Sequence, residues 1–272
     1  MHTAQLTLKY LQASVHVGSG EPPISTQPLR ILDLCTGTGC ISLLLHALLA
    51  GHLHRLFILG IDLSTTAIGL AKENLEHNLR LGLLSNRSRT EIHFHQGDVL
   101  AYDTGDIPKL EKALESCAPP HEGGSGPKQA FEWDVLISNP PYVSPTSLQD
   151  GTTARSVRTY EPELALVPPA HMNHHAISCK REDIFYYRLI TLSFKLSIKV
   201  SVLECGSRQQ GGRVATMFKD LAKLRQDHEW AIDIWPDIET GLRDNCLDEG
   251  NGPCAVILRR LPTYTPDQQS CV

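Results

Sequence analysis

The sequence lacks several features that would assign it to other classes of protein. Its eight cysteines include no C-x-x-C pair and no secretory signal precedes them, so we expect free thiols in a reducing compartment. No apolar run is long enough to span a membrane, and the first residues are not an Arg-rich transit peptide. The formal net charge of −5 argues against a protein that binds nucleic acid mainly through phosphates.

A recognisable metal site is also missing. His171, His174 and His175 lie near Cys179 in a polar segment, but their spacing matches no common structural zinc pattern. We therefore interpret residues 168–182 as a surface loop with solvent-facing histidines and predict no metal ligand.

What the sequence contains is an alternation of short apolar runs and segments with helical periodicity. Strands are predicted at 31–34, 57–62, 92–95, 135–137, 200–203, 230–235 and 255–258. Helices are predicted at 41–49, after Ser64, and at 107–117, 183–196 and 213–225. This order predicts an open α/β sheet, and 272 residues are enough to bury its core as one domain. Insertions interrupt it near 103–132 and 168–182.

The first strand runs into a loop of small residues. Asp33 lies near the end of this strand, and the loop is Cys35-Thr36-Gly37-Thr38-Gly39. The two glycines let the chain turn tightly and let a ligand approach the backbone. The loop has neither the dinucleotide fingerprint nor the Gly-Lys-Ser/Thr of a phosphate loop. Asp33 instead indicates a carboxylate facing a cationic or amine-bearing ligand, and S-adenosylmethionine carries both a sulfonium and an α-amino group.

Two further strands lead into acidic residues. Asp62, followed by Leu63, is placed to accept hydrogen bonds from ribose hydroxyls. Its alternative role is to cap the next helix, but Ser64 is already a suitable N-cap. Asp98 is placed to meet an adenine amino group, with Val99 packing on the ring. A plain turn residue is the alternative for Asp98.

Asn139-Pro140-Pro141-Tyr142 is the most informative motif, and we predict that these four residues are catalytic. The two prolines stop the apolar strand at 135–137 because neither can donate to a sheet. The corner that results suits a planar –NH2 group. Asn139 and the Pro140 carbonyl accept its two hydrogens while Tyr142 stacks on its plane. Methyltransferases acting on planar nitrogens use this corner, and an ordinary Pro-Pro turn is the alternative.

Together these motifs resemble those of the Rossmann-like methyltransferases that use S-adenosylmethionine. More narrowly, they resemble the HemK/PrmC family, which methylates the side-chain amide of the glutamine in the Gly-Gly-Gln motif of peptide-chain release factors. The closer likeness also rests on Tyr-Glu-Pro-Glu-Leu-Ala-Leu at 160–166, Phe-Tyr-Tyr-Arg at 185–188 and Leu-Glu-Cys-Gly at 203–206. It covers roughly residues 29 to 260.

The resemblance implies a seven-stranded sheet, mostly parallel with an antiparallel last strand, and helices on both faces. It implies S-adenosylmethionine as cofactor, with Asn139 also near it, and a release factor as protein partner rather than nucleic acid or a membrane. Glu161 is expected to line the channel that admits the glutamine, or else to be an exposed charge before Pro162. We expect a monomer, mitochondrial in a eukaryote and otherwise cytoplasmic.

The sequence departs from the family pattern in three places. The Lys-Pro-Gly-Gly turn often found before the fifth strand is absent, and Phe194 to Lys199 stands there instead. Cys35 stands where the family usually has Gly, which the loop tolerates if the Cys35 backbone keeps a negative φ. The helical domain that usually comes first is not visible. We therefore expect residues 1–28 to be a helix and linker left from a longer chain, 29–262 to be the methyltransferase domain and 263–272 a tail. Such a chain is expected to methylate a whole release factor poorly.

Two other functions remain open from the residues alone. The same corner could methylate an exocyclic amine of adenine or guanine in nucleic acid. A truncated family member could instead bind cofactor or a partner without turnover.

Overall fold

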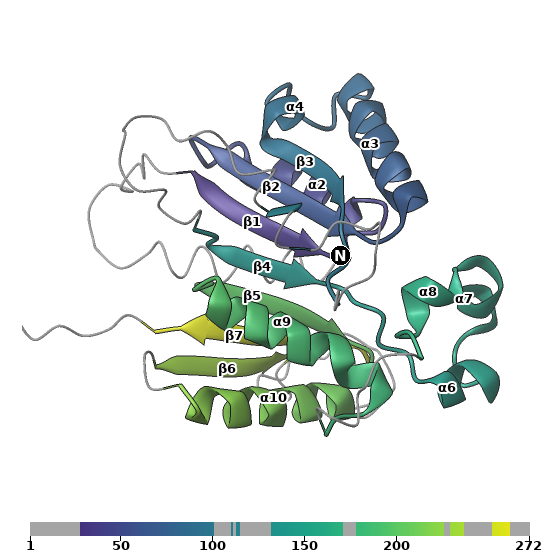
Figure 1. The fold of residues 1–272 in the computed structure, drawn as a ribbon. Coiled ribbons are helices and arrows are strands. Elements are labelled where there is room, and N and C mark those ends of the chain that lie inside the picture. Colours follow the sequence, from purple (N-terminus) through teal and green to yellow (C-terminus); the bar gives the residue numbers. More distant parts are fainter. Residues whose placement is uncertain are drawn as a thin grey trace, which may run out of the picture.

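The computed structural model describes residues 28–100, 110, 113–114, 132–170, 178–225, 229–236 and 252–261. Their strands form one sheet of seven, in the order β3-β2-β1-β4-β5-β7-β6 (Figure 1). The strands are β1 (Leu29–Leu34), β2 (Leu56–Asp62), β3 (Ile92–Gln96), β4 (Val135–Ser138), β5 (Val200–Cys205), β6 (Trp230–Trp235) and β7 (Cys254–Arg260). Strands β1 to β5 pair in parallel, whereas β7 is inserted antiparallel between β5 and β6. The predicted sheet is confirmed.

The helices include several that the sequence did not predict. They are α2 (Cys40–Leu49), α3 (Thr65–Arg80), α4 (Ser88–Glu91), α6 (Pro145–Gln149), α7 (Arg155–Tyr160), α8 (Glu163–Leu166), the 3-10 helix η2 (Arg181–Asp183), α9 (Ile184–Lys195) and α10 (Arg208–Lys223). The short helices α4, α6, α7 and α8 had no counterpart in the sequence interpretation. Residues 1–27, the tail at 263–272, most of the helix at 107–117 and of the 103–132 insertion, and the three histidines of 168–182 lie outside the described residues.

Helix α10 begins at Arg208, so its predicted start at Arg213 was wrong. The Ser207 hydroxyl accepts a hydrogen bond from the Gln210 backbone N–H at 3.2 Å and caps the helix there. Gly211 then lies inside the helix, where glycine is normally unfavourable. A Cβ at Gly211 would stand 2.8 Å from the Cys254 sulfur, so the glycine lets α10 pack closely on β7.

Apolar side chains alternate between the two faces of the sheet, and helices cover both. Leu32, Leu59 and Leu136 pack in the same buried cluster as residues of α9, drawn over β5 in Figure 1, and of α10, drawn beneath β6. Their neighbours Ile31 and Ile58 point the other way and pack with α2 and α3. Fully burying one such side chain contributes about 1.5–3 kcal/mol, so the sheet is a rigid base for the loops at its edge.

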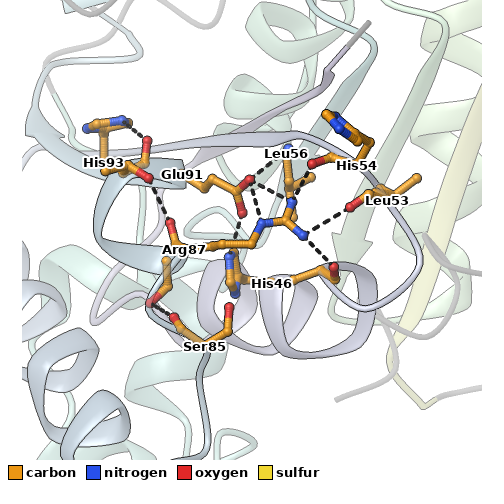
Figure 2. A network of polar contacts seen from close by, with 11 residues as sticks. His46, Leu53, His54, Leu56, Ser85, Arg87, Glu91 and His93 are labelled. Carbon is orange, nitrogen blue, oxygen red and sulfur yellow. Dashed lines mark hydrogen bonds and ion pairs between the residues drawn. The ribbon is translucent and has the colours of Figure 1, made fainter. Parts of the chain in front are cut away.

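Polar contacts stabilise the side of the sheet at which β2 and β3 begin (Figure 2). The Arg87 guanidinium donates to the carbonyls of Ala50, Leu53 and His54, and to the Glu91 carboxylate. Glu91 also accepts the N–H at the start of β2 and lies 3.0 Å from Nε2 of the fully buried His46. Burial lowers the pKa of His46. These contacts fix the connection from α2 to β2.

The order of the strands reverses between β1 and β4. The chain continues outward from β1 on one side through β2 and β3, and on the other side through β4 and β5. Ligands of open α/β sheets bind outside the carboxyl ends of the strands at such a reversal. The Ser138 hydroxyl donates to the Leu34 carbonyl at 2.7 Å and holds the two strand ends together. Helices α6, α7 and α8 lie beyond this edge (Figure 1).

Candidate functional site

Asp33 organises the loop that follows β1. The side chain is fully buried, and its Oδ2 accepts hydrogen bonds from the hydroxyls of Thr36 and Ser42, both at 2.7 Å. Oδ1 has no hydrogen-bond partner among the described residues. Burial raises the pKa of Asp33 to about 6. A buried carboxylate oxygen without a donor fits an amine or another cationic group of a ligand.

Gly37 and Gly39 both have a left-handed backbone, with φ of 57° and 79°, but their surroundings differ. A Cβ at Gly39 would stand 2.7 Å from the Phe94 ring and 3.1 Å from the Ala71 Cβ. At Gly37, no described atom lies within 4 Å of that position. Gly39 is therefore required by internal packing, whereas Gly37 leaves room for a ligand beside the backbone.

Cys35 also has a left-handed backbone, with φ of 60°, so the condition of a negative φ is not met. A residue with a Cβ costs about 1–2 kcal/mol in this region, which explains why glycine suits the position. The loop needs the turn because the next N–H, that of Thr36, donates to the Ile61 carbonyl at 3.0 Å. Burial raises the pKa of the Cys35 thiol, and the charges of Asp62, Asp33 and Asp98 raise it further.

Asp62 connects the glycine loop to the end of β2. Its Oδ2 accepts the Gly37 N–H and its Oδ1 accepts the Ser64 N–H, each at 2.9 Å. The Ser64 hydroxyl caps α3 by accepting the Ala67 N–H at 3.2 Å. Each Asp62 oxygen has a further lone pair with which it can accept a ligand hydroxyl.

The remaining predicted cofactor residues border this loop. The Thr38 carbonyl accepts from the Asn74 side chain at 3.0 Å, and the carbonyl of half-buried Leu63 accepts from the Gln96 side chain at 3.0 Å. Asp98 Oδ1 accepts the Leu100 N–H at 2.8 Å, so its turn role is present. Val99 is buried in the core. The contacts of Asp98 and Val99 with adenine stay predictions.

The corner at 139–142 combines an exposed amide with a buried backbone. Asn139 is exposed, Pro140 and Pro141 are buried, and Tyr142 is half-buried. The Asn139 side chain makes no hydrogen bond to another described residue, so within that part of the chain its amide is available to a ligand. Burial and the nearby Glu204 raise the pKa of Tyr142 to about 12. The Tyr142 phenol therefore stays protonated near neutral pH. Exposed Glu161 is a further charge that raises the pKa of Tyr142.

Gly206 and Gln210 support this corner, and neither was among the predicted site residues. A Cβ at Gly206 would stand 2.8 Å from the Tyr142 ring, so the ring lies directly on the end of β5. The Gln210 side chain donates to the Tyr142 carbonyl at 3.2 Å. A glycine directly after a buried strand was the available signal for Gly206; nothing in the sequence pattern distinguishes Gln210 from Gln209.

The structure thus brings both groups of predicted residues to one edge. Asp33 and Asp62 lie at the carboxyl ends of β1 and β2, Asp98 follows β3, and the corner follows β4; because these four strands pair in parallel, their carboxyl ends lie on the same side of the sheet. Among the described residues, no group of three or more His, Cys, Asp or Glu side chains could hold a metal ion. In the same part of the chain, no helix combines the length and the apolar character needed to cross a membrane.

Comparison with known proteins first identifies the class. Two solved structures that cover 95% of this chain are a human methyltransferase 10 domain containing protein and the N-terminal domain of human METTL16 in complex with SAH. Each superposes with a TM-score of 0.51 at 14% identity, covering 82% and 70% of the respective structure. The fold is that of the Rossmann-like methyltransferases.

Sequence relatives then identify the family. The chain is 32% identical to the probable MRF1 mitochondrial N(5)-glutamine methyltransferase mtq1 of Schizosaccharomyces pombe, over 74% of this chain and 56% of that protein. It is 28% identical to the release factor glutamine methyltransferase of Haemophilus influenzae, over 80% and 58%. It is 30% identical to mitochondrial MRF1 N(5)-glutamine methyltransferase MTQ1 of Saccharomyces cerevisiae, over 60% and 42%. The chain belongs to the HemK/PrmC family.

The chain spans about half the length of the curated relatives it matches. No family model matches it.

Proposed function

We propose that this protein transfers a methyl group from S-adenosylmethionine to the side-chain amide nitrogen of the glutamine in the Gly-Gly-Gln motif of a peptide-chain release factor. The observation that carries the proposal is the exposed Asn139 amide beside the half-buried Tyr142 ring, next to the glycine loop. The names of the fungal and bacterial relatives support the substrate class.

The residues at the edge of the sheet fit S-adenosylmethionine. Asp33 Oδ1, buried and without a described partner, suits the α-amino group, and the open space at Gly37 suits close approach of the ligand. Asp62 would accept the ribose hydroxyls, and Asp98 with Val99 would meet the adenine. When bound, the cofactor supplies a reactive methyl group on a positively charged sulfur.

The corner would prepare the amide for attack on that methyl group. An amide nitrogen is a weak nucleophile because its lone pair is delocalised into the carbonyl. The Asn139 side-chain oxygen and the Pro140 carbonyl would accept both N–H hydrogens, which places electron density on nitrogen and favours the transition state. Tyr142, whose phenol stays protonated, would hold the amide plane with its ring. Positioning supplies most of the catalysis. The carbon–sulfur bond would break as the carbon–nitrogen bond forms, and the nitrogen would lose one proton once it carries the methyl group, so no general base has to act first.

The protein partner would meet the segment that follows the corner. Val143 donates its N–H to the Leu166 carbonyl at 2.8 Å, so α6, α7 and α8 leave the sheet and return beside Tyr142. We propose that Glu161 in this segment lines the entrance for the glutamine. We also propose that residues 29–262 are the methyltransferase domain and that the protein acts as a monomer. We propose a mitochondrial location if the protein is eukaryotic, which the names of the fungal relatives support, and a cytoplasmic location otherwise.

Asp62→Ala tests the cofactor site. We expect the affinity for S-adenosylmethionine to fall by about 1–3 kcal/mol, because the variant loses the hydrogen bonds to the ribose and the Gly37 N–H loses its acceptor. Calorimetry measures the change, with Asp220→Ala, at an exposed ion pair on α10, as the control. An unchanged dissociation constant would restrict Asp62 to a structural role.

A labelling experiment tests the function itself. The protein is incubated with methyl-labelled S-adenosylmethionine and, in separate reactions, a Gly-Gly-Gln peptide, a release factor and RNA or DNA. We expect label on the glutamine side chain, located by fragmentation mass spectrometry. Label on nucleic acid alone would replace the proposal with methylation of a base amine. No label on any acceptor, despite measurable cofactor binding, would indicate a family member without turnover.

A further inference from the structure

The buried Gln210 amide joins three segments of the chain. Its Oε1 accepts the Gly206 N–H at 2.9 Å, at the end of β5. Its Nε2 lies 3.2 Å from the Tyr142 carbonyl, in the corner. The same nitrogen lies 3.0 Å from Asp183 Oδ1 and 3.2 Å from the Glu182 carbonyl, both just before α9. Only 4% of Gln210 is exposed, so these contacts are made away from bulk water.

Asp183 and Arg213 fix this amide in one orientation. Asp183 is buried, and Arg213 donates to both of its carboxylate oxygens, at 2.5 Å from Nε and 2.8 Å from Nη2. Such a two-point ion pair is strong and directional. Turning the Gln210 amide over would place its oxygen against the Asp183 carboxylate and the Tyr142 carbonyl. No hydrogen bond could then form, because carboxylate and carbonyl oxygens only accept. The orientation with Nε2 toward Asp183 is therefore the one that satisfies these groups.

The position of Tyr142 follows from this arrangement. One side of the Gln210 amide holds the Tyr142 backbone, and the other holds Gly206, on which the Tyr142 ring lies. The Gln210 side chain thus fixes the position of both the backbone and the ring of Tyr142.

We propose that Gln210, oriented by Asp183 and Arg213, is the positioning residue that sets the Tyr142 ring for methyl transfer. The inference rests on the proposed function, because Tyr142 is assigned there to hold the acceptor amide. Gln210 acts through Tyr142 and does not contact the reacting atoms. A displacement of about 1 Å in a catalytic group costs on the order of 100-fold in rate, so loss of Gln210 should reduce turnover.

Gln210→Met removes the amide at nearly constant volume, and Gln209→Met is the matched control because Gln209 is exposed on the same helix. We expect kcat for a Gly-Gly-Gln peptide to fall about 10- to 100-fold in Gln210→Met, while KM and the dissociation constant of S-adenosylmethionine change less than about threefold. Gln209→Met should behave as wild type. A purely structural role would lower the melting temperature and leave kcat of the folded variant unchanged, which would overturn the proposal.

Gly206→Ala displaces the same ring and keeps the Gln210 amide, because its Cβ would stand 2.8 Å from the ring but at an ordinary contact distance of 3.5 Å from Gln210 Oε1. We expect a similar loss of kcat, and a double variant with Gln210→Met that is less affected than the product of the two single losses. Fully multiplicative losses would mean that Gln210 and Gly206 act on different groups, contrary to the proposal.

A spectroscopic measurement separates this inference from the proposed function. In protein labelled with 3-fluorotyrosine, the Tyr142 fluorine signal is assigned by its absence in Tyr142→Phe. It should shift or broaden in Gln210→Met and not in Gln209→Met, whichever acceptor the enzyme uses. An unmoved signal would refute the positioning role even if wild-type protein methylates the peptide. A moved signal in a protein that methylates only nucleic acid would retain the role and refute the proposed substrate.

Discussion

Asn139→Ala is expected to abolish measurable methyl transfer while the affinity for S-adenosylmethionine stays within a few fold of wild type. The Asn139 oxygen is proposed to accept a hydrogen from the acceptor amide, and this bond strengthens as nitrogen gains positive charge in the transition state. Removing one such stabilising group from an active site costs about 100- to 1,000-fold in kcat. Because Asn139 is exposed, its truncation should barely change the free energy of unfolding.

Single-turnover kinetics with a Gly-Gly-Gln peptide, together with calorimetry of cofactor binding, measure the two quantities separately. Asn86→Ala removes an exposed amide far from the corner and serves as control. Asn139→Asp keeps one acceptor oxygen, replaces the –NH2 group by a second oxygen and adds a charge that the site does not require. Near-normal turnover in Asn139→Ala would reduce the corner to a Pro-Pro turn and remove the basis of the functional assignment.

The second large effect separates the two loop glycines. Gly39→Ala should lower the free energy of unfolding by about 2–5 kcal/mol, because a left-handed residue with a Cβ costs about 1–2 kcal/mol and a crowded methyl about 1–3 kcal/mol. The methyl would press on Phe94 and Ala71. Gly37→Ala carries only the backbone cost, since no described atom stands near its Cβ position.

The order reverses for ligand binding. In Gly37→Ala the new methyl occupies space proposed for the cofactor. The affinity for S-adenosylmethionine should therefore fall at least about tenfold, a loss that lies within the about 1–3 kcal/mol that overpacking costs. Chemical denaturation and calorimetry on the two variants test both statements. Equal losses of stability would show that the Phe94 contact is relieved by local movement, and unchanged affinity in Gly37→Ala would place the cofactor elsewhere.

The sheet and its edge were largely predictable because each strand is a short apolar run with turn-forming or acidic residues after it. The strand at Val135 to Ile137, for example, is followed by two prolines, which mark where it ends. The antiparallel insertion of β7 came instead from the family resemblance, since Cys254 to Arg260 contains nothing that specifies its neighbours.

The contacts that set the fine geometry were not predictable, because they join residues far apart in the chain. The left-handed backbone at Cys35 accompanies the hydrogen bond between Thr36 and Ile61. Gly211 is placed inside α10 because a side chain there would collide with Cys254 of β7. Gln210 acquires its importance mainly from Asp183 and Tyr142, which lie far from it in the chain, and also from Gly206, four residues before it. Local propensity carries no information about such partners.

The hydrogen bond between Val143 and Leu166 has a consequence for how this enzyme can change. It joins the two ends of the segment that carries α6, α7 and α8, so both ends connect to the rest of the protein at neighbouring positions. Within α6 and α7 no residue is buried, and Leu166 is the buried residue of α8. We therefore expect that the segment can be replaced as a unit without unfolding the sheet, provided that both ends of that bond are kept.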